Sequence, residues 1–381
     1  MRYCSPEEVW LREDRLARAF EVADSNVGRA YPGYELAVLK DGCVAARKAS
    51  GAAELVPARR EVTPDMLFDL ASVTKALATS VVYARLLEEG LISLRQPVVE
   101  LVPDFRYTAA GPNQVKESVK VWMLLAHTSG LPPWLPLYKT ARSRDEVIQE
   151  AVRAFPTYEP GRAVVYSDIN YIVLTHIAER VTGERFDSLF EKLVAKPLGL
   201  SRTVFNPLER GFDRSEIVAT EVVEWRGGTL VGVVHDENAY AMGGVSGHAG
   251  LFSTAVESAR IAWGIVEAYS GLSDTLISQA SARAVLAQWV CGDVCYGLGW
   301  QVYEPGAGSG TLVDLRPTRL FGHTGFTGTS VLLAPEARLV VVFYTNRVHP
   351  SRSNEEIRRV RPLVHNAVLS SVRRWYLEPS Q

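Results

Sequence analysis

The sequence predicts an α/β (α+β) fold in which one antiparallel sheet, built from both ends of the chain and flanked by helices, carries a mainly helical domain inserted in the middle. Strand-like alternation occurs in residues 34–51 and again in 297–346, whereas helix-like segments dominate between about 95 and 200. Strands at the two ends of a chain can pair in one sheet while the intervening helices pack outside it, and this order favours an α+β architecture. With 381 residues, 47% of them hydrophobic, the chain can bury a core large enough for such a fold.

The first elements follow from local patterns. Residues 6–30 mix charged and apolar side chains as a surface helix does. The segment "YELAVLKDGCVAARKASG" alternates like two strands around Asp41-Gly42, a dipeptide typical of a two-residue hairpin turn. Residues 73–90 are apolar on most faces and end at Gly90, which predicts a buried helix.

The rest of the chain divides into a helical middle and a mixed C-terminal part. Helices are expected at 119–130, 143–155, 168–183 and 186–200. After a loop-rich region at 203–250, helices are expected at 254–268, 278–289 and 354–375, and strands at 297–304, 328–337 and 338–346. We therefore expect a sheet domain of residues 1–90 and 205–381, an inserted helical domain of 91–204, and the active site between them.

Charge and composition exclude several classes of partner. A net charge of −2 provides no overall field toward nucleic acid or an anionic membrane. The start "MRYCSPEEVWLREDRLARAF" carries acidic residues early and has no long apolar run, so neither a signal peptide nor a membrane anchor is expected. These features favour a cytoplasmic protein that acts on a small-molecule or peptide substrate. The sequence does not reveal its oligomeric state.

Four cysteines are too few for a disulfide scaffold in a chain of this length. Cys4 and Cys43 look isolated. Cys291 and Cys295 are spaced more widely than the tightest zinc knuckles and have no second pair, so buried thiols are expected rather than a metal site.

The stretch "FDLASVTKALATSVVYARLLEEGLISL" contains a Ser-x-x-Lys motif formed by Ser72 and Lys75. Residues three apart lie on the same face of a helix, so the lysine amine can reach the serine hydroxyl. At a helix N-terminus, free N–H groups favour negative charge on the serine oxygen, and burial lowers the pKa of the amine. The pair could therefore be a nucleophile and its base. Alternatively, Ser72 caps a helix and Lys75 lies on the surface.

Two further motifs give a resemblance to a known family. "GRAVVYSDINY" holds Tyr166 and Asp168 before a helix, and "FGHTGFTGTSVLL" places His323, Thr324 and Gly325 at the head of a strand. With Ser-x-x-Lys, this order resembles the serine β-lactamase and penicillin-binding-protein family, in the branch of class C-type enzymes, D-alanyl-D-alanine carboxypeptidases, esterases and cell-wall amidases. The stretches "LLAHTSGLP" and "VHDENAYAMGGVSGHAGLFSTA" extend the likeness to about residues 30–370.

The resemblance implies a role for each motif residue. Ser72 would be the nucleophile, Lys75 and Tyr166 would share proton transfer, and the N–H groups of Ser72 and Phe326 would form the oxyanion hole. Asp168, His323, Thr324 and Gly325 would bind substrate, and a side chain at Gly325 would crowd it. For Tyr166 the alternative is a tyrosine that only packs at a helix start.

Two positions depart from the family pattern. Asp168 stands where asparagine is usual, so a carboxylate that only accepts hydrogen bonds replaces an amide, which puts β-lactam recognition in doubt. Asp168 could instead simply cap the following helix. His323 replaces the commoner lysine, and its hold on a substrate carboxylate should be weaker and dependent on pH.

Other polar clusters favour structural roles. The residues from His127 to Gly130 are expected to cap and connect helices. His235, Asp236 and His248 could suggest a metal triad, but in the resembling branch this stretch is a loop beside the active site, so neither a metal nor an organic cofactor is expected. The sequence has no Gly-x-Ser-x-Gly, which argues against an α/β-hydrolase.

The sequence therefore predicts a serine hydrolase that cleaves an amide or ester through an acyl-enzyme, most plausibly on a peptidoglycan-like peptide or amide. A small-ester esterase is the first alternative and a β-lactamase the second. A penicillin-sensing binding module is the non-enzymatic alternative. Sensors of that type usually continue into a membrane helix, and the sequence has no run of about 18 apolar residues.

Overall fold

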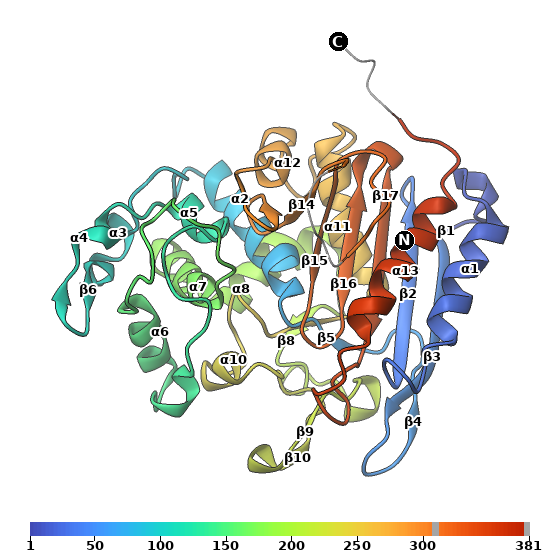
Figure 1. The fold of residues 1–381 in the computed structure, drawn as a ribbon, viewed down its shortest axis with the longest axis horizontal. Helices are drawn as coiled ribbons and strands as arrows, with labels where there is room; N and C mark the ends of the chain where they lie inside the picture. The colour runs from blue at the N-terminus through green and yellow to red at the C-terminus, as the bar shows by residue number, and fades with distance from the viewer. Residues whose placement is uncertain (307–311, 377–381) are drawn as a thin grey trace.

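The centre of the molecule is a ten-stranded sheet whose strands come from both ends of the chain (Figure 1). In the computed structural model, which describes residues 1–306 and 312–376, the strand order is β1-β3-β2-β17-β16-β15-β14-β13-β12, with β4 paired to β3. The strands span Arg2–Tyr3 (β1), Gly33–Lys40 (β2), Cys43–Glu54 (β3), Arg60–Glu61 (β4), Val290–Cys291 (β12), Cys295–Tyr296 (β13), Gln301–Tyr303 (β14), Leu320–Thr324 (β15), Ser330–Ala334 (β16) and Leu339–Thr345 (β17). β1 pairs with β3 in parallel and the other neighbours are antiparallel. The predicted fold class is confirmed.

Helices cover both faces of this sheet because its central strands are apolar on both sides. Along β2, Leu36 and Val38 pack into one hydrophobic core, and Ala37 and Leu39 pack into the other. The first core is closed by α1 (Glu13–Asp24) and α13 (Ile357–Ser370), and the second by α2 (Ser80–Glu88), α11 (Ala255–Tyr269) and α12 (Gln279–Leu286). The alternation of side chains across a strand therefore places one core on each face.

The predicted hairpin forms as expected. β2 and β3 pair in an antiparallel ladder that ends at Lys40 and Cys43. Between these strands, Asp41 and Gly42 have φ angles of 50° and 75°. Two left-handed residues in succession form the turn whose twist matches paired strands, and the Asp-Gly dipeptide accommodates it.

The middle of the chain forms the helical part at the left of Figure 1. Its helices are α3 (Val98–Leu101), α4 (Gln114–Glu117), α5 (Val121–Leu125), α6 (Arg144–Val152), α7 (Asp168–Thr182), α8 (Phe186–Phe190) and α9 (Lys196–Leu198). Small sheets join β6 (Tyr107–Thr108) to β7 (Gly111–Pro112), β9 (Val222–Val223) to β10 (Gly228–Thr229), and β5 (Phe68–Asp69) to β11 (Leu251–Ser253) and β8 (Val204–Phe205). One hydrophobic core runs from these helices to the large sheet, and the domain boundaries at 90 and 204 stay a prediction.

Local expectations need correction in two places. His323 and Thr324 close β15 instead of heading the next strand, since β16 begins only at Ser330. The buried helix expected from residue 73 contains a π-helical turn at Lys75–Thr79 before α2 begins. Within the described residues, no helix is both long and apolar enough to cross a membrane.

The cysteines also differ from expectation, because they form two disulfides, Cys4–Cys43 and Cys291–Cys295. Cys43 and Cys4 meet because β1 pairs in parallel with the start of β3. Cys291 and Cys295 face each other across the β12–β13 hairpin. Sequence spacing could not reveal the first pair, whose members are brought together by strand pairing over a separation of 39 residues.

Candidate active site

Most of the predicted site residues line one cavity of about 290 Å³ at the end of β15, whereas Lys75 and Asp168 lie outside its lining. The lining side chains come from the Ser72 turn, the segment before α7, the hairpin of β13 and β14, the end of β15, and α13 with its preceding loop. They are Ser72, Tyr166, Tyr296, Gln301, His323, Thr324, Gly325, Phe326, Arg347, Glu355, Ile357, Arg358 and Arg361. Six of these residues were singled out in the sequence.

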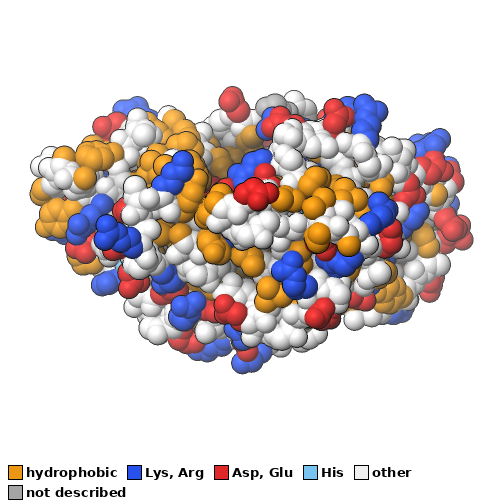
Figure 2. All heavy atoms as spheres, turned by 90° about the horizontal axis from the view of Figure 1, so that it is seen from below, with side chains coloured by type: hydrophobic (Ala, Val, Ile, Leu, Met, Phe, Trp, Pro, Cys, Tyr) orange, Lys and Arg blue, Asp and Glu red, His pale blue; other side chains and the backbone are white. Residues whose placement is uncertain are grey.

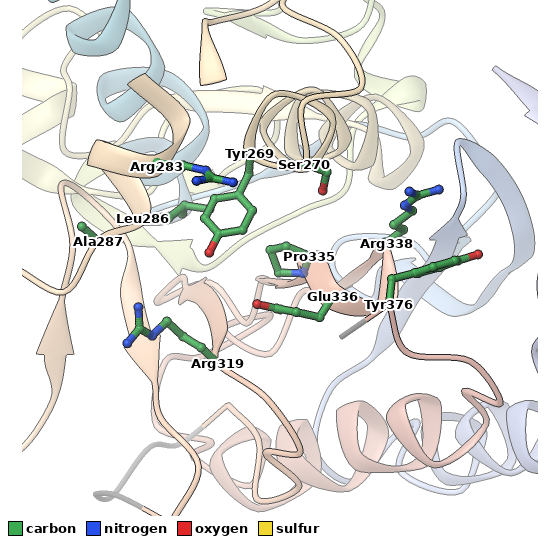
Figure 3. A pocket seen from close by; sticks show the side chains of 10 residues that line it. All are labelled: Tyr269, Ser270, Arg283, Leu286, Ala287, Arg319, Pro335, Glu336, Arg338 and Tyr376. Atoms are coloured by element: carbon green, nitrogen blue, oxygen red, sulfur yellow. The ribbon is translucent and has the colours of Figure 1, made fainter. Parts of the chain in front are cut away.

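Another cavity, of about 470 Å³, contains none of the predicted residues (Figure 3). Tyr269 of α11 and Arg283 of α12 lie side by side there, and the carboxylate of Glu336 points between Tyr269 and Arg319. Acidic and basic side chains are mixed, and no nucleophile with a base lines it. The smaller cavity is therefore the candidate active site.

A strained turn presents Ser72. The buried carboxylate of Asp69 accepts hydrogen bonds from the N–H groups of Ala71 (2.8 Å) and His235 (2.6 Å). Ala71 has a left-handed φ of 46°, a conformation that costs energy for a residue with a side chain. The turn leaves Ser72 directly before the helical residues, as the Ser-x-x-Lys pattern requires.

Lys75 lies fully buried beneath the serine and contacts three acceptors. Its Nζ donates to Ser72 Oγ at 3.0 Å and to the carbonyl of His248 at 2.9 Å, and it lies 2.7 Å from Asp168 Oδ1. Burial lowers the pKa of the Lys75 amine, because the charged form loses its hydration, while the Asp168 carboxylate opposes this shift. The alternative of a surface lysine is therefore wrong.

Tyr166 lies against both members of the pair. Its ring centroid is 5.0 Å from Lys75 Nζ, and its ring packs on that of His127 at 4.5 Å. Burial and the Asp168 carboxylate raise the pKa of the Tyr166 phenol, and its hydrogen bond with Ser72 lowers it. The raised pKa keeps the hydroxyl protonated at neutral pH, so it can pass a proton on but is not a resting phenolate.

Asp168 does not cap α7. The cap is Ser167, whose hydroxyl accepts from the N–H of Asn170. The carboxylate of Asp168 instead pairs with Lys75 from the first turn of the helix. The departure from the family's asparagine thus places a carboxylate beside the amine of Lys75, a contact that motif spacing did not indicate.

The loop after β15 carries the second proposed oxyanion donor. Among the described residues, neither the N–H of Ser72 nor that of Phe326 has a hydrogen-bond acceptor, and both residues line the cavity. The hydroxyls of Thr327 and Thr329 donate to the carbonyls of Asp69 (2.7 Å) and Leu70 (2.9 Å). These two bonds tie the Phe326 loop to the turn that presents Ser72.

Gly325 is required by the protein itself. A Cβ at this position would lie 2.1 Å from Thr329 Oγ1 and 2.5 Å from the carbonyl of Leu70. A side chain at residue 325 was expected to crowd the substrate, but it would first clash with Thr329 and Leu70 of the protein.

His323 is buried, and its Nδ1 lies 2.9 Å from the carbonyl of Thr324. Burial, and to a lesser degree the nearby Lys75, lower the pKa of His323 to about 3. The ring is thus neutral at physiological pH and supplies no positive charge for a carboxylate.

Three arginines line the same cavity, and they were not singled out in the sequence. Arg361 of α13 and Arg347 after β17 are buried, and Arg358 is exposed at the rim. Within the described part of the chain, neither Arg347 nor Arg361 forms an ion pair, and Arg361 Nε has no hydrogen-bond partner. The run "EEIRRVR" shows several arginines on the last helix, but not which of them faces the cavity.

The residues considered as a metal triad point to different partners. His235 Nε2 lies 2.9 Å from Glu221, whereas His248 Nε2 lies 2.7 Å from Asp236. Each histidine therefore pairs with a carboxylate of its own.

Comparisons with known proteins identify the family and the fold. The putative D-alanyl-D-alanine carboxypeptidase of Escherichia coli (strain K12) is 33% identical to the chain over 373 residues, which cover 91% of this chain and 85% of that protein. Two solved structures share the fold at 20% identity and a TM-score of 0.70. EstCE1, a hydrolase with promiscuous acyltransferase activity, matches 91% of this chain and 98% of its own, and a penicillin-binding protein homolog from Caulobacter crescentus matches 95% and 98%. The β-lactamase family model matches residues 16–365, and the chain therefore belongs to the β-lactamase family.

Proposed function

We propose that the protein is a serine hydrolase that removes the C-terminal residue of a peptidoglycan-like peptide through an acyl-enzyme at Ser72. The observation that carries this proposal is that one cavity is lined by Ser72, whose hydroxyl is hydrogen-bonded to Lys75, and by two buried arginines, Arg347 and Arg361, that form no ion pair within the described residues. The family relative named as a carboxypeptidase supports the same substrate class.

The proposed reaction begins at Ser72. Its Oγ attacks the scissile carbonyl carbon and its proton passes to the neutral amine of Lys75. The N–H groups of Ser72 and Phe326 then donate to the negative oxygen of the tetrahedral intermediate. When the C–N bond breaks, the proton moves from Lys75 through the hydroxyl of Tyr166 to the leaving amine. Water attacks the resulting ester and gives its proton to Lys75, which returns it to Ser72 Oγ as the acid leaves.

The arginines would hold the carboxylate of the leaving residue. Arg361 remains protonated at neutral pH, since burial lowers its pKa only to about 10. A buried guanidinium without an ion-pair partner attracts an anion strongly, because water screens little of its charge. This assigns to Arg361 and Arg347 the role that sequence reasoning gave to His323.

A small-ester esterase stays the second candidate, and the neutral ring of His323 favours it, because an ester needs no cation beside the leaving group. Turnover of a D-alanyl-D-alanine peptide, p-nitrophenyl acetate and nitrocefin separates the candidates. We expect the highest kcat/KM for the peptide. Turnover of the acetate without turnover of the peptide would establish the esterase, and fast hydrolysis of nitrocefin would establish a β-lactamase.

The nucleophile is tested by Ser72→Ala. We expect turnover to fall by at least about a thousandfold, since removal of a nucleophile leaves only binding and oxyanion stabilisation. Intact-protein mass spectrometry should show one fluorophosphonate adduct on the wild type and none on the variant. An adduct on Ser72→Ala would assign the nucleophile to another residue.

A further inference from the structure

Residues 246–248, which we call the base strap, are held on both sides by hydrogen bonds to two helical segments. Thr79, in the π-helical turn, donates its hydroxyl to the carbonyl of Gly247 at 2.7 Å. The N–H of Gly247 donates to the hydroxyl of Thr175 in α7, also at 2.7 Å. A Cβ at Gly247 would lie 2.7 Å from Thr79 Oγ1 and 3.0 Å from Thr175 Oγ1. The backbone of the strap is therefore fixed in close contact with both segments.

The imidazole of His248 anchors the end of the strap. Its Nε2 lies 2.7 Å from Asp236 Oδ1, and its Nδ1 lies 2.8 Å from Ser246 Oγ. Burial raises the pKa of the Asp236 carboxyl, but His248 lowers it by more, so the group is ionised at neutral pH. An ionised carboxylate only accepts hydrogen bonds, so His248 Nε2 carries a hydrogen and donates it to Asp236.

Asp236 reaches the strap from the lower face of the molecule. Its Oδ1 also accepts the N–H of Ala239 at 2.8 Å and so caps α10 (Glu237–Ala241), which lies at the lower edge in Figure 1. Figure 2 views this face, on which hydrophobic side chains gather near the middle beside a recess. The Asp236 side chain is 21% exposed, whereas His248 and Lys75 are buried. The contacts therefore lead from a partly solvated carboxylate to the interior amine.

The three neighbours of Lys75 Nζ differ in what they can do. The carbonyl of His248 and the carboxylate of Asp168 only accept hydrogen bonds, whereas Ser72 Oγ can also donate one. A neutral amine has two hydrogens and one lone pair. Its hydrogens therefore bind His248 and Asp168, and the lone pair faces Ser72. Loss of either acceptor lets the lone pair turn away from the serine proton.

We propose that Asp236 is a positioning residue for Lys75: by holding the imidazole of His248, it fixes the carbonyl that orients the amine toward Ser72. This rests on the proposed function, because it assumes that Lys75 takes the proton of Ser72. Asp236 does not line the cavity, so it acts on the reaction through the strap and not through contact with substrate.

Two substitutions at Asp236 separate its contact with His248 from its charge and from the helix cap. Asp236→Asn keeps an Oδ1 that accepts from both partners but removes the charge. Asp236→Ser keeps a cap, since serine is a preferred N-cap residue, but its side chain is too short to hold His248. Asp213→Ser is the matched control, because it makes the same exchange at the cap of the 3₁₀ helix Arg214–Glu216. His248→Ala removes the anchored ring without changing the α10 cap, and tests the same contact if Asp236→Ser does not fold.

The measurement is the rate at which a fluorophosphonate modifies Ser72 between about pH 5 and 10, because this reaction needs the proton transfer but no particular peptide. Ser72 Oγ bonds to phosphorus, fluoride leaves, and the hydroxyl proton passes to Lys75. We expect Asp236→Ser and His248→Ala to lower the rate at the high-pH plateau by about tenfold, since a displacement of about 1 Å can cost about a hundredfold and the strap keeps its backbone anchors. Asp236→Asn and Asp213→Ser should stay within about threefold of the wild type.

The pH profile supplies a readout that a merely structural role would not move. Burial lowers the pKa of Lys75, and the carboxylates of Asp168 and Asp236 oppose this shift. Asp236→Asn should therefore move the rising limb of the profile toward lower pH and keep the plateau. The other titratable groups around the amine stay the same in this variant: Asp168, Tyr166, Tyr171, His127, His248 and His323.

Wild-type plateau rates in Asp236→Ser and His248→Ala would overturn the positioning role. Equal losses in Asp236→Asn and Asp236→Ser would also overturn it, because they would assign the effect to charge. A wild-type rate in Lys75→Arg would reject the base and, with it, this role. If no peptide is cleaved while the fluorophosphonate rates change as expected, the peptide substrate is rejected and the role of Asp236 stands.

Discussion

At the scale of single residues, the contact between Asp168 and Lys75 sets the pH at which Lys75 could act as the proposed base. The amine must be neutral to accept the proton of Ser72, and its pKa reflects two opposed effects, since burial favours the neutral form and the carboxylate 2.7 Å away favours the ammonium. With the family's usual asparagine at this position, burial would still lower the pKa of Lys75, but a neutral hydrogen bond would replace the opposing charge. Asp168 is therefore expected to raise the pH at which activity appears, and Asp168→Asn should remove this effect.

We expect Asp168→Asn to move the rising limb of the pH profile of kcat/KM toward lower pH. Loss of the carboxylate lowers the pKa of Lys75 further, so more of the amine is neutral at a given pH. The measurement uses a neutral ester between pH 5 and 9, so that substrate charge stays constant. Glu355→Gln is the control, because Glu355 lines the same cavity but pairs with Arg358. An unmoved limb, or a limb moved upward, would separate Asp168 from the base.

Arg361 governs a second property, the preference for a carboxylate. We expect Arg361→Met to lower kcat/KM for a peptide with a free C-terminus by about tenfold to a hundredfold, as the loss of a charged hydrogen bond of about 1.5–3 kcal/mol implies. The amidated peptide should change by less than about threefold, so the ratio of the two separates charge recognition from general damage. Arg359→Met, on an exposed position of the same helix, should leave the ratio unchanged. Equal losses on both peptides would contradict the assignment.

At the scale of elements, the site depends on the attachment of one loop to one turn. The proposed oxyanion donors, Ser72 and Phe326, belong to segments more than 250 residues apart. The hydroxyls of Thr327 and Thr329 hold those segments together through the carbonyls of Asp69 and Leu70. Both threonines are buried, so their hydroxyls cannot exchange these partners for bulk water.

The double variant Thr327→Val, Thr329→Val should lower kcat by about tenfold or more with little change in KM. In other enzymes, removal of one oxyanion donor lowers kcat by about 10²–10³-fold, and a donor that is only displaced should lower kcat by less. The two lost hydrogen bonds also cost about 0.5–1.5 kcal/mol each in stability, which thermal unfolding measures, and the Leu70 carbonyl keeps the N–H of Val73 as a donor. Thr182→Val removes a threonine bond to a carbonyl within α7 and should lower the Tm without affecting kcat. The idea fails if kcat stays constant while the Tm falls.

Elements with strong local signals were predictable from sequence, and those defined by distant pairing were not. The β2–β3 hairpin follows from Asp41-Gly42, and the Ser72–Lys75 contact follows from helical spacing. The strand that contains His323 and ends at Thr324 was misplaced because β15 is short and recognisable only beside β14 and β16. The arginines were missed because the orientation of α13 depends on its packing against the sheet.

At the scale of the whole molecule, the first and last described segments of the chain are fastened to each other. Leu11 bridges to Val372, and the N–H of Arg12 donates to the carbonyl of Ser371 at 2.8 Å. β1 adds only two residues to the sheet edge, and the Cys4–Cys43 disulfide ties that short strand to β3. Stability of this end can therefore change without a change in the catalytic residues.

We expect Cys4→Ala, Cys43→Ala to lower the free energy of unfolding by up to about 4 kcal/mol, the loop-closure estimate for a separation of 39 residues. Urea unfolding measures the loss, and kcat/KM should stay within about twofold.

For Cys291→Ala, Cys295→Ala the expected loss in the free energy of unfolding is only about 2 kcal/mol, because the loop that this disulfide closes is much shorter. Such bonds persist in oxidising compartments, and the cytoplasm expected from sequence keeps cysteines reduced. A reductant should therefore lower the free energy of unfolding of the wild type by breaking the Cys4–Cys43 bond. It should cause no such loss in the first double variant, which lacks this bond. If the variant and the wild type unfold at the same urea concentration before and after reduction, the sheet edge does not depend on this disulfide.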